Sequence, residues 1–127
     1  MIKDYFISLS DFKEFVNELN NNSLGRNIVI NGIDDFDLDQ SFDLAIFSIN
    51  DLQIDQENFS DFTKKIRKKI YSLSNGGWNL KILDLGIFNK GNQHSDSQFA
   101  INEILNQLSI LKVKAVSYTH LRAHETG

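Results

Sequence analysis

Short apolar runs alternate with longer amphipathic segments along most of this chain, and that alternation restricts the fold more than any other feature of the sequence. Residues 27–32 form a β-branched run that a glycine closes, and residues 43–49 form a second run after an acidic loop. Runs of this kind are typical of buried strands. Further strands are expected at residues 80–86 and from Lys112 onward. Strands that alternate with helices of roughly 12–16 residues predict crossover connections and a parallel sheet with helices on its faces.

Three segments carry apolar residues at helical spacing. We expect Ser10 to cap the first helix, and Ser95 or Asp96 to cap the last. The expected core face of the first helix is Phe12, Phe15, Val16 and Leu19. In the second helix, within residues 58–74, it is Phe59, Phe62, Ile66, Ile70 and Leu73. In the third it is Phe99, Ala100, Ile104, Leu105, Leu108 and Leu111.

Length, charge and cysteine content narrow the class of protein. The chain has 127 residues, which fits one small domain, and it has no cysteine, which excludes disulfides and thiolate metal sites. Its net charge of -4 speaks against a nucleic-acid-binding protein, because such domains concentrate positive charge. No run approaches the ~18 apolar residues that span a bilayer, and the N-terminus lacks a long apolar signal segment. We therefore expect a cytoplasmic protein with no nucleic-acid and no membrane partner.

Residues 115–127 differ in composition from the Asn-, Ile- and Lys-rich sequence before them. Their codons would be richer in G and C, and residues 116–126 can be written as a transposase-type sequencing adapter translated in an open frame. We interpret residues 115–127 as a non-native, adapter-derived tail and residues 1–114 as the native part. As a genuine segment, the tail would instead offer His120 and His124 at the spacing of a zinc-binding pair on a helix.

Two clusters of like charge carry weak functional signals. Asp35, Asp37 and Asp39 have the spacing of the first three ligands of a calcium loop. The pattern then fails, because Gln40 stands where the loop needs glycine and Ile46 where it needs glutamate. A basic run that could contact a polyanion consists of Lys64, Lys65, Arg67, Lys68 and Lys69. A solvated loop and the wet side of an amphipathic helix account for both clusters.

Asp84 is the carboxylate best placed for a functional role. We expect it at the carboxyl end of the strand at residues 80–86, the edge at which open α/β sheets bind ligands. It is the one candidate binding residue, and the alternative is a purely structural role in holding the following loop. His94, in that loop, could titrate near neutral pH but has no second ligand or nucleophile nearby in the sequence.

Four stretches of the chain follow motifs of one enzyme family. Residues 66–73, IRKKIYSL, are similar to the pattern I-R-x-x-L-Y-x-L, and residues 80–86, LKILDLG, to L-K-I-x-D-L-G-N. Residues 42–51, FDLAIFSIND, are similar to F-D-x-x-I-x-G-I-x-E-D, and residues 96–101, DSQFAI, to D-T-x-x-A-L. In order and spacing these stretches resemble the arginase/agmatinase/formimidoylglutamase (ureohydrolase) family, and most closely a bacterial arginase-like branch.

The resemblance covers about residues 42–114 and departs from the family at Ser48, which replaces a glycine, and at Ile87, where Asn or Asp is usual. It implies a three-layer α/β/α sandwich around a parallel sheet, and homo-oligomers of the full-length protein. It also implies two manganese ions that activate a hydroxide for attack on a guanidino or formimino carbon. The family's metal ligands lie in G-G-x-H-D, D-A-H-x-D and later D-x-D turns, the first of which would follow the strand that begins at Lys112.

The resemblance therefore predicts that residues 1–114 are the incomplete N-terminal portion of a ureohydrolase-like domain. The metal-ligand turns are not in this chain, so we assign no catalytic and no metal-binding residue and expect the chain alone to be inactive. One alternative is a non-catalytic binding or assembly protein of the arginase fold. Another is an unrelated small α/β interaction domain, in which Asp34, Asp35 and Asp84 would form an acidic pocket.

Overall fold

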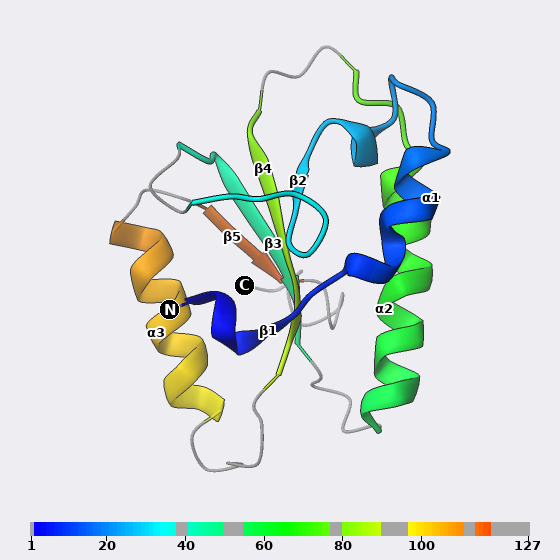
Figure 1. The fold of residues 1–127 in the computed structure, drawn as a ribbon. Coiled ribbons are helices and arrows are strands. Elements are labelled where there is room, and N and C mark those ends of the chain that lie inside the picture. The colour runs from blue at the N-terminus through cyan, green and yellow to red at the C-terminus, as the bar shows by residue number, and fades with distance from the viewer. Residues whose placement is uncertain are drawn as a thin grey trace.

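The computed structural model describes residues 2–37, 41–49, 55–76, 80–89, 97–110 and 114–117. Its helices and strands (Figure 1) follow the order β1 (Phe6–Ile7), α1 (Lys13–Asn17), β2 (Val29–Ile30), β3 (Leu44–Ser48), α2 (Gln56–Tyr71), β4 (Ile82–Phe88), α3 (Ser97–Ile110) and β5 (Lys114–Ser117). Short 3₁₀ turns lie at Ile2–Tyr5, Ser10–Phe12 and Leu24–Arg26. The expected alternation of strands and helices is confirmed from β3 to β5, and the strand expected at residues 27–32 is reduced to β2.

The sheet is mixed, and the expectation of a wholly parallel sheet is wrong. Its order is β1-β4-β3-β5, with β2 also paired to β4. The strand β3 is parallel to both β4 and β5, and β2 is parallel to β4. In contrast, β1 runs antiparallel to β4, with Phe6 opposite Phe88 and Ile7 opposite Ile87. A strand of two residues shows no periodicity, so the sequence pattern does not indicate β1.

Two short strands share one edge of β4. The parallel strand β2 pairs with the start of β4, and the antiparallel strand β1 pairs with its end. Between them Gly86 has a φ of +103°, and a Cβ atom there would lie 2.3 Å from the carbonyl oxygen of Ile7. Glycine at this position therefore allows β1 to approach β4 closely.

Helices cover both faces of the sheet (Figure 1). On one face α3 contributes Ile104 and Leu108 to a core that it shares with β1, β3 and β4. On the other face α1 and α2 contribute Val16, Phe59 and Tyr71 to a second core. The architecture is thus mixed α/β. No helix in the described part of the chain is long and apolar enough to cross a membrane.

Helix α2 turns a different face to the sheet from the expected one. Its buried positions, spaced four residues apart, are Phe59, Thr63, Arg67 and Tyr71. Phe62 and Leu73, both expected in the core, are 41% and 58% exposed. Ile66 and Ile70 are only partly buried. The expectation that all five basic residues lie on the wet side is wrong for Arg67, because this side chain has its partners in the strand beneath the helix.

The start of α1 also differs from the expectation. The helix begins at Lys13 after the turn Ser10–Phe12, and no side chain caps either element, so the expected Ser10 cap is wrong. By contrast, Asp55 caps α2, because its carboxylate accepts a hydrogen bond from the backbone N–H of Asn58 at 2.8 Å. The expected caps of α3, Ser95 and Asp96, lie outside the described residues.

The core faces expected for the other two helices are confirmed in part. Phe12 and Val16 are buried, and Phe15 and Leu19 are half-buried. On α3, Ile104 and Leu108 are buried, but Leu105 is 41% exposed. The side chains of Phe99, Ala100 and Leu111 lie outside the description.

Candidate functional site

The order of the strands reverses at β3. The chain passes from β3 through α2 to β4 on one side of β3, and then through α3 to β5 on its other side. Helices α2 and α3 lie on opposite faces of the sheet (Figure 1). In open α/β sheets, ligands bind outside the carboxyl ends of the strands at such a reversal. The candidate site is therefore the carboxyl end of β3 beside β5, where Phe47 lies in register with Ser117. Three of the four residues of β5, at positions 115–117, belong to the segment that we interpret as adapter-derived, so the site is argued from β3.

Ser48 is the last residue of β3 at this edge. Its side chain is fully buried, and its Oγ atom has no hydrogen-bond partner within the described part of the protein. A buried hydroxyl normally has a partner, so Ser48 is an unusual polar group at the place where the topology favours a ligand. In the sequence, Ser48 stands out only as a serine within an apolar run.

Asp84 lies inside β4, not at its end. The strand continues to Phe88, which is four residues beyond Asp84 and two beyond the expected end of the strand at Gly86. The Asp84 carboxylate is fully buried and accepts hydrogen bonds from two side chains of α2. Its Oδ2 atom accepts from Arg67 Nε at 2.8 Å and from the Tyr71 hydroxyl at 2.5 Å. Its Oδ1 atom accepts from Arg67 Nη2 at 3.0 Å and from the backbone N–H of Gly86 at 3.0 Å.

Arg67 connects the same strand at a second point. Besides the two hydrogen bonds that Arg67 donates to Asp84 from Nε and Nη2, Nη2 also donates to the carbonyl oxygen of Gly86 at 2.9 Å. Arg67 and Tyr71 lie one helical turn apart, so both reach the same carboxylate. We refer to Arg67, Tyr71 and Asp84 as the Asp84 cluster. Because the ion pair is fully buried and both oxygens of Asp84 accept hydrogen bonds from α2, the Asp84 cluster fixes the orientation of α2 on β4.

This arrangement gives both oxygens of Asp84 partners within the chain. The carboxylate is not exposed to solvent, and its hydrogen bonds are those of a group that holds two elements together. The role of Asp84 in binding stays a prediction. His94 and the histidines His120 and His124 lie outside the described residues.

The acidic residues of the loop after β2 do not join Asp84. Asp34 Oδ2 accepts a hydrogen bond from the backbone N–H of Ile30 at 3.0 Å, and Asp34, Asp35 and Asp37 are exposed. Residues 38–40, which hold the next position of the calcium-like pattern, lie outside the described part. Within residues 2–37, 41–49, 55–76, 80–89, 97–110 and 114–117, no three His, Asp or Glu side chains are grouped as a metal ion requires.

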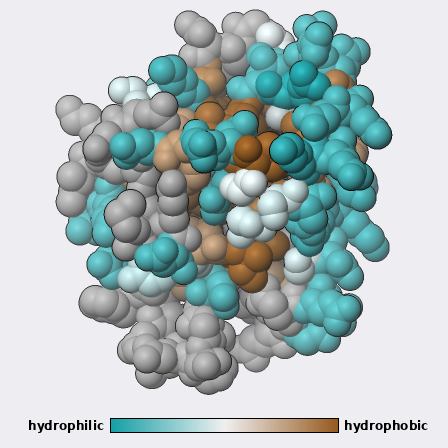
Figure 2. Space-filling model, in the orientation of Figure 1, coloured by the Kyte–Doolittle hydropathy of each residue, from teal (hydrophilic) through white to brown (hydrophobic). Residues whose placement is uncertain are grey.

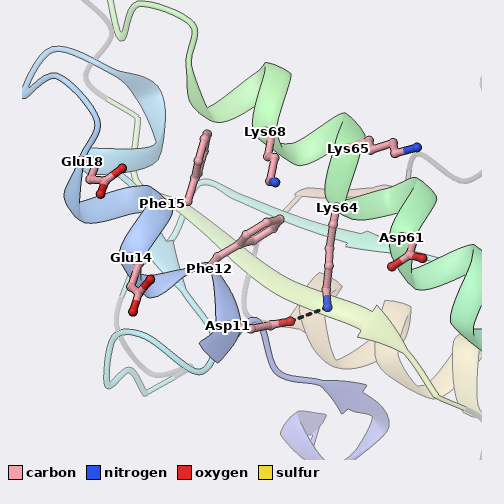
Figure 3. Close-up of a pocket in the computed structure, with 9 residues that line it drawn as sticks. All are labelled: Asp11, Phe12, Glu14, Phe15, Glu18, Asp61, Lys64, Lys65 and Lys68. Carbon is pink, nitrogen blue, oxygen red and sulfur yellow. Dashed lines mark hydrogen bonds and ion pairs between the residues drawn. The ribbon is translucent and has the colours of Figure 1, made fainter.

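A groove of about 520 Å³ lies between α1 and α2 (Figure 3). One wall carries lysines of α2 and the other carries acidic residues and two phenylalanine rings of the first helical segment. Lys64 pairs with Asp11, and the Lys68 ammonium lies 5.8 Å from the centre of the Phe15 ring. The hydrogen bond from Lys64 holds the pKa of the Asp11 carboxyl below its usual value. Lys64 therefore binds the turn Ser10–Phe12 to α2, and Lys68 binds α1 to α2. The outer side of both helices is hydrophilic (Figure 2).

Comparisons of the chain with protein-family models, with curated proteins and with solved structures give no match. Its function must therefore be argued from the pattern of its own residues and from the contacts that these residues make.

Proposed function

We propose that this chain is the amino-terminal part of a ureohydrolase-type enzyme, which hydrolyses C–N bonds in guanidino or formimino compounds. The observation that carries the proposal is that two of the family-like motifs interact directly. Arg67 and Tyr71 belong to the motif at residues 66–73, and Asp84 and Gly86 to the motif at residues 80–86. All four residues are joined by hydrogen bonds in the Asp84 cluster and at its margin.

The contacts explain why such motifs occur together at a fixed spacing. Arginine is needed at position 67 because it alone binds a carboxylate and a backbone carbonyl with a planar set of donors. Glycine is needed at position 86 because of its positive φ and the close approach of Ile7. Each motif is thus half of one interaction. This mutual dependence supports a reading of the motifs as a single family signature.

In such an enzyme, this chain has a structural role: it holds the strands in position and does not itself bind the metal ions. A pair of manganese ions requires several carboxylate and imidazole donors that face one another. The described residues contain no such group, and both oxygens of Asp84 are engaged by Arg67, Tyr71 and Gly86. These residues do not fit a dimanganese site, so no step of the reaction is assigned to them. The two ions, the substrate and the homo-oligomeric assembly belong to the proposal for the full-length protein.

Resequencing the source DNA across codon 114 with long reads tests this proposal most directly. We expect an open reading frame that continues from Lys114 into a G-G-x-H-D turn and later into a D-A-H-x-D turn. A frame that continues without any sequence similar to these turns would exclude the ureohydrolase proposal. A frame that keeps the turns but replaces their metal ligands would favour a non-catalytic protein of the same fold. Reads that contain codons 115–127 as genomic sequence would remove the adapter interpretation.

An activity assay then distinguishes the full-length enzyme from the 127-residue chain with a structural role. The protein encoded by the continued frame is expected to release urea or formamide from guanidino or formimino substrates when supplied with Mn²⁺. The 127-residue chain, assayed at equal concentration, is expected to release neither. Manganese-dependent release of urea by the purified 127-residue chain would contradict the proposed structural role.

A further inference from the structure

The regular alternation of side chains between the two faces of the sheet is interrupted within β4. Leu83 and Leu85 belong to the core beneath α3, as alternation along a strand requires. Ile87 should follow them, but it lies in the core beneath α1 and α2, and Phe88 takes the place beneath α3. One extra residue has therefore been inserted between Leu85 and Ile87.

The pairing with β3 locates that insertion. Ile46 lies opposite Asp84, but the next residue, Phe47, lies opposite Gly86, so Leu85 has no counterpart. This is a β-bulge. In a regular register Phe47 would instead lie opposite Leu85, and every later side chain of β4 would change face.

Side chains bind the backbone groups around the bulge. The N–H of Gly86 donates to Asp84 Oδ1 at 3.0 Å, and its carbonyl oxygen accepts from Arg67 Nη2 at 2.9 Å. The carbonyl oxygen of Leu85 accepts from Asn31 Nδ2 at 2.9 Å. Two of these three contacts come from the Asp84 cluster, which is itself fully buried.

The bulge also determines how the N-terminal segment joins the sheet. It places Gly86 where β1 leaves no room for a Cβ atom, and it precedes the two residues that pair with β1. Immediately after them, the N–H of Asn89 donates to the carbonyl oxygen of Tyr5 at 2.7 Å. With a regular register, the face and the spacing of this pairing edge would both change.

We propose that the Asp84 cluster is a register lock, a conformational device that selects the bulged register of β4 and thereby allows β1 to dock. The buried charges serve this selection. A regular strand would leave Arg67 and Asp84 without the Gly86 carbonyl and N–H groups that they now bind, which is costly for buried charges. The register lock belongs to the fold and does not depend on the proposed function.

The test is amide hydrogen exchange by NMR in the double variant Arg67→Met/Asp84→Leu. This variant removes both charges together, so no unpaired ion is left in the core. We expect the Asn89 amide, which reports on the docking of β1, to exchange about tenfold faster or more. The Asp43 amide, which donates to the carbonyl oxygen of Lys81 at 2.8 Å far from the bulge, is the internal reference and should change much less. The interstrand contacts of Phe47 should shift from Gly86 toward Leu85.

An unchanged ratio of Asn89 to Asp43 exchange, with Phe47 still opposite Gly86, would overturn the proposal. In that case Gly86 and Asn31 alone would set the register. If the double variant does not fold, Arg67→Lys decides the question. Lysine keeps the charge but cannot bind both Asp84 and the Gly86 carbonyl in the planar geometry of arginine. Faster exchange at Asn89 in Arg67→Lys supports the lock, and unchanged exchange overturns it.

Discussion

Arg67 and Asp84 carry opposite charges into a part of the protein from which solvent is excluded. Removing two ions from water is costly, and their attraction offsets that cost only when further hydrogen bonds satisfy both groups. Tyr71 and the backbone of Gly86 supply further bonds to the Asp84 carboxylate and to Nη2 of Arg67. The pair is therefore an all-or-none unit, in which the loss of one member is worse than the loss of both.

Arg67→Met is expected to lower the free energy of unfolding by about 3–5 kcal/mol, because it leaves Asp84 buried without its cation. The matched control is Lys65→Met on the exposed side of the same helix, which should change the free energy by less than about 0.5 kcal/mol. Urea denaturation monitored by circular dichroism measures both. A loss below about 1 kcal/mol for Arg67→Met would mean that water or another group replaces the arginine.

At the scale of elements, periodicity predicts β3, α2, β4 and α3 but predicts the wrong end for β4 and the wrong buried face for α2. In the sequence, Gly86 is typical of a turn residue and predicts that β4 ends there. In the structure, β4 continues to Phe88, and Gly86 follows a bulge within the strand. Hydrophobicity ranks Ile66 above Arg67 as a core residue of α2. The partner that buries Arg67 is 17 residues away in the sequence, and pattern analysis of one helix does not include it.

The rotated face of α2 is tested by two phenylalanines on the same helix. Phe59 is fully buried and Phe62 is 41% exposed. Phe59→Ala is therefore expected to destabilise the protein by about 3–5 kcal/mol, and Phe62→Ala by less than about 1 kcal/mol. Thermal and urea unfolding of the two variants give the comparison. Equal losses would restore the helix face that the sequence pattern favours.

The contact between the turn Ser10–Phe12 and α2 depends on pH through Asp11. Its folded-state pKa is below the ordinary value of 3.8, chiefly because of the hydrogen bond from Lys64. The contribution of this pair is therefore present above pH 3.8 and is lost as the pH falls through the lowered pKa. Because the Asp11 side chain is 61% exposed, we expect the contribution to be below about 1 kcal/mol.

Urea unfolding of the wild type and of Asp11→Asn, from neutral pH into strong acid, measures this contribution. The stabilities should differ at neutral pH and converge in acid, and added salt should reduce the difference. Glu14→Gln, a neighbouring change on α1, is the control for a general effect of charge. A difference between wild type and Asp11→Asn that persists in strong acid would contradict the assignment to this ion pair.

At the scale of the whole molecule, the N-terminal segment joins both layers of helices. Phe6 belongs to the core beneath α3, and Leu9 belongs to the core beneath α1 and α2. The Tyr5 hydroxyl donates to Glu103 Oε2 on α3 at 3.0 Å, across 98 residues of sequence. The local sequence pattern does not contain contacts of this range, so it predicts neither β1 nor its role in the sheet. The candidate site, by contrast, follows from the order of β3, β4 and β5, most of which periodicity did indicate.

The hydrogen bond between Tyr5 and Glu103 predicts a change at alkaline pH. The bond to Glu103, reinforced by burial and by nearby negative charge, raises the pKa of the Tyr5 phenol above its ordinary value of 10.0. The phenol donates while it is protonated, so its contribution to stability is complete below pH 10.0 and disappears as the pH rises through the raised pKa.

An NMR titration of the Tyr5 ring should therefore give a lower pKa in Glu103→Ala than in the wild type. Glu57→Ala, on the exposed surface of α2, should leave the Tyr5 titration unchanged. If Glu103→Ala also leaves it unchanged, the N-terminal segment is not held to α3 by this bond, and its place in the sheet depends on β1 and the bulge of β4 alone.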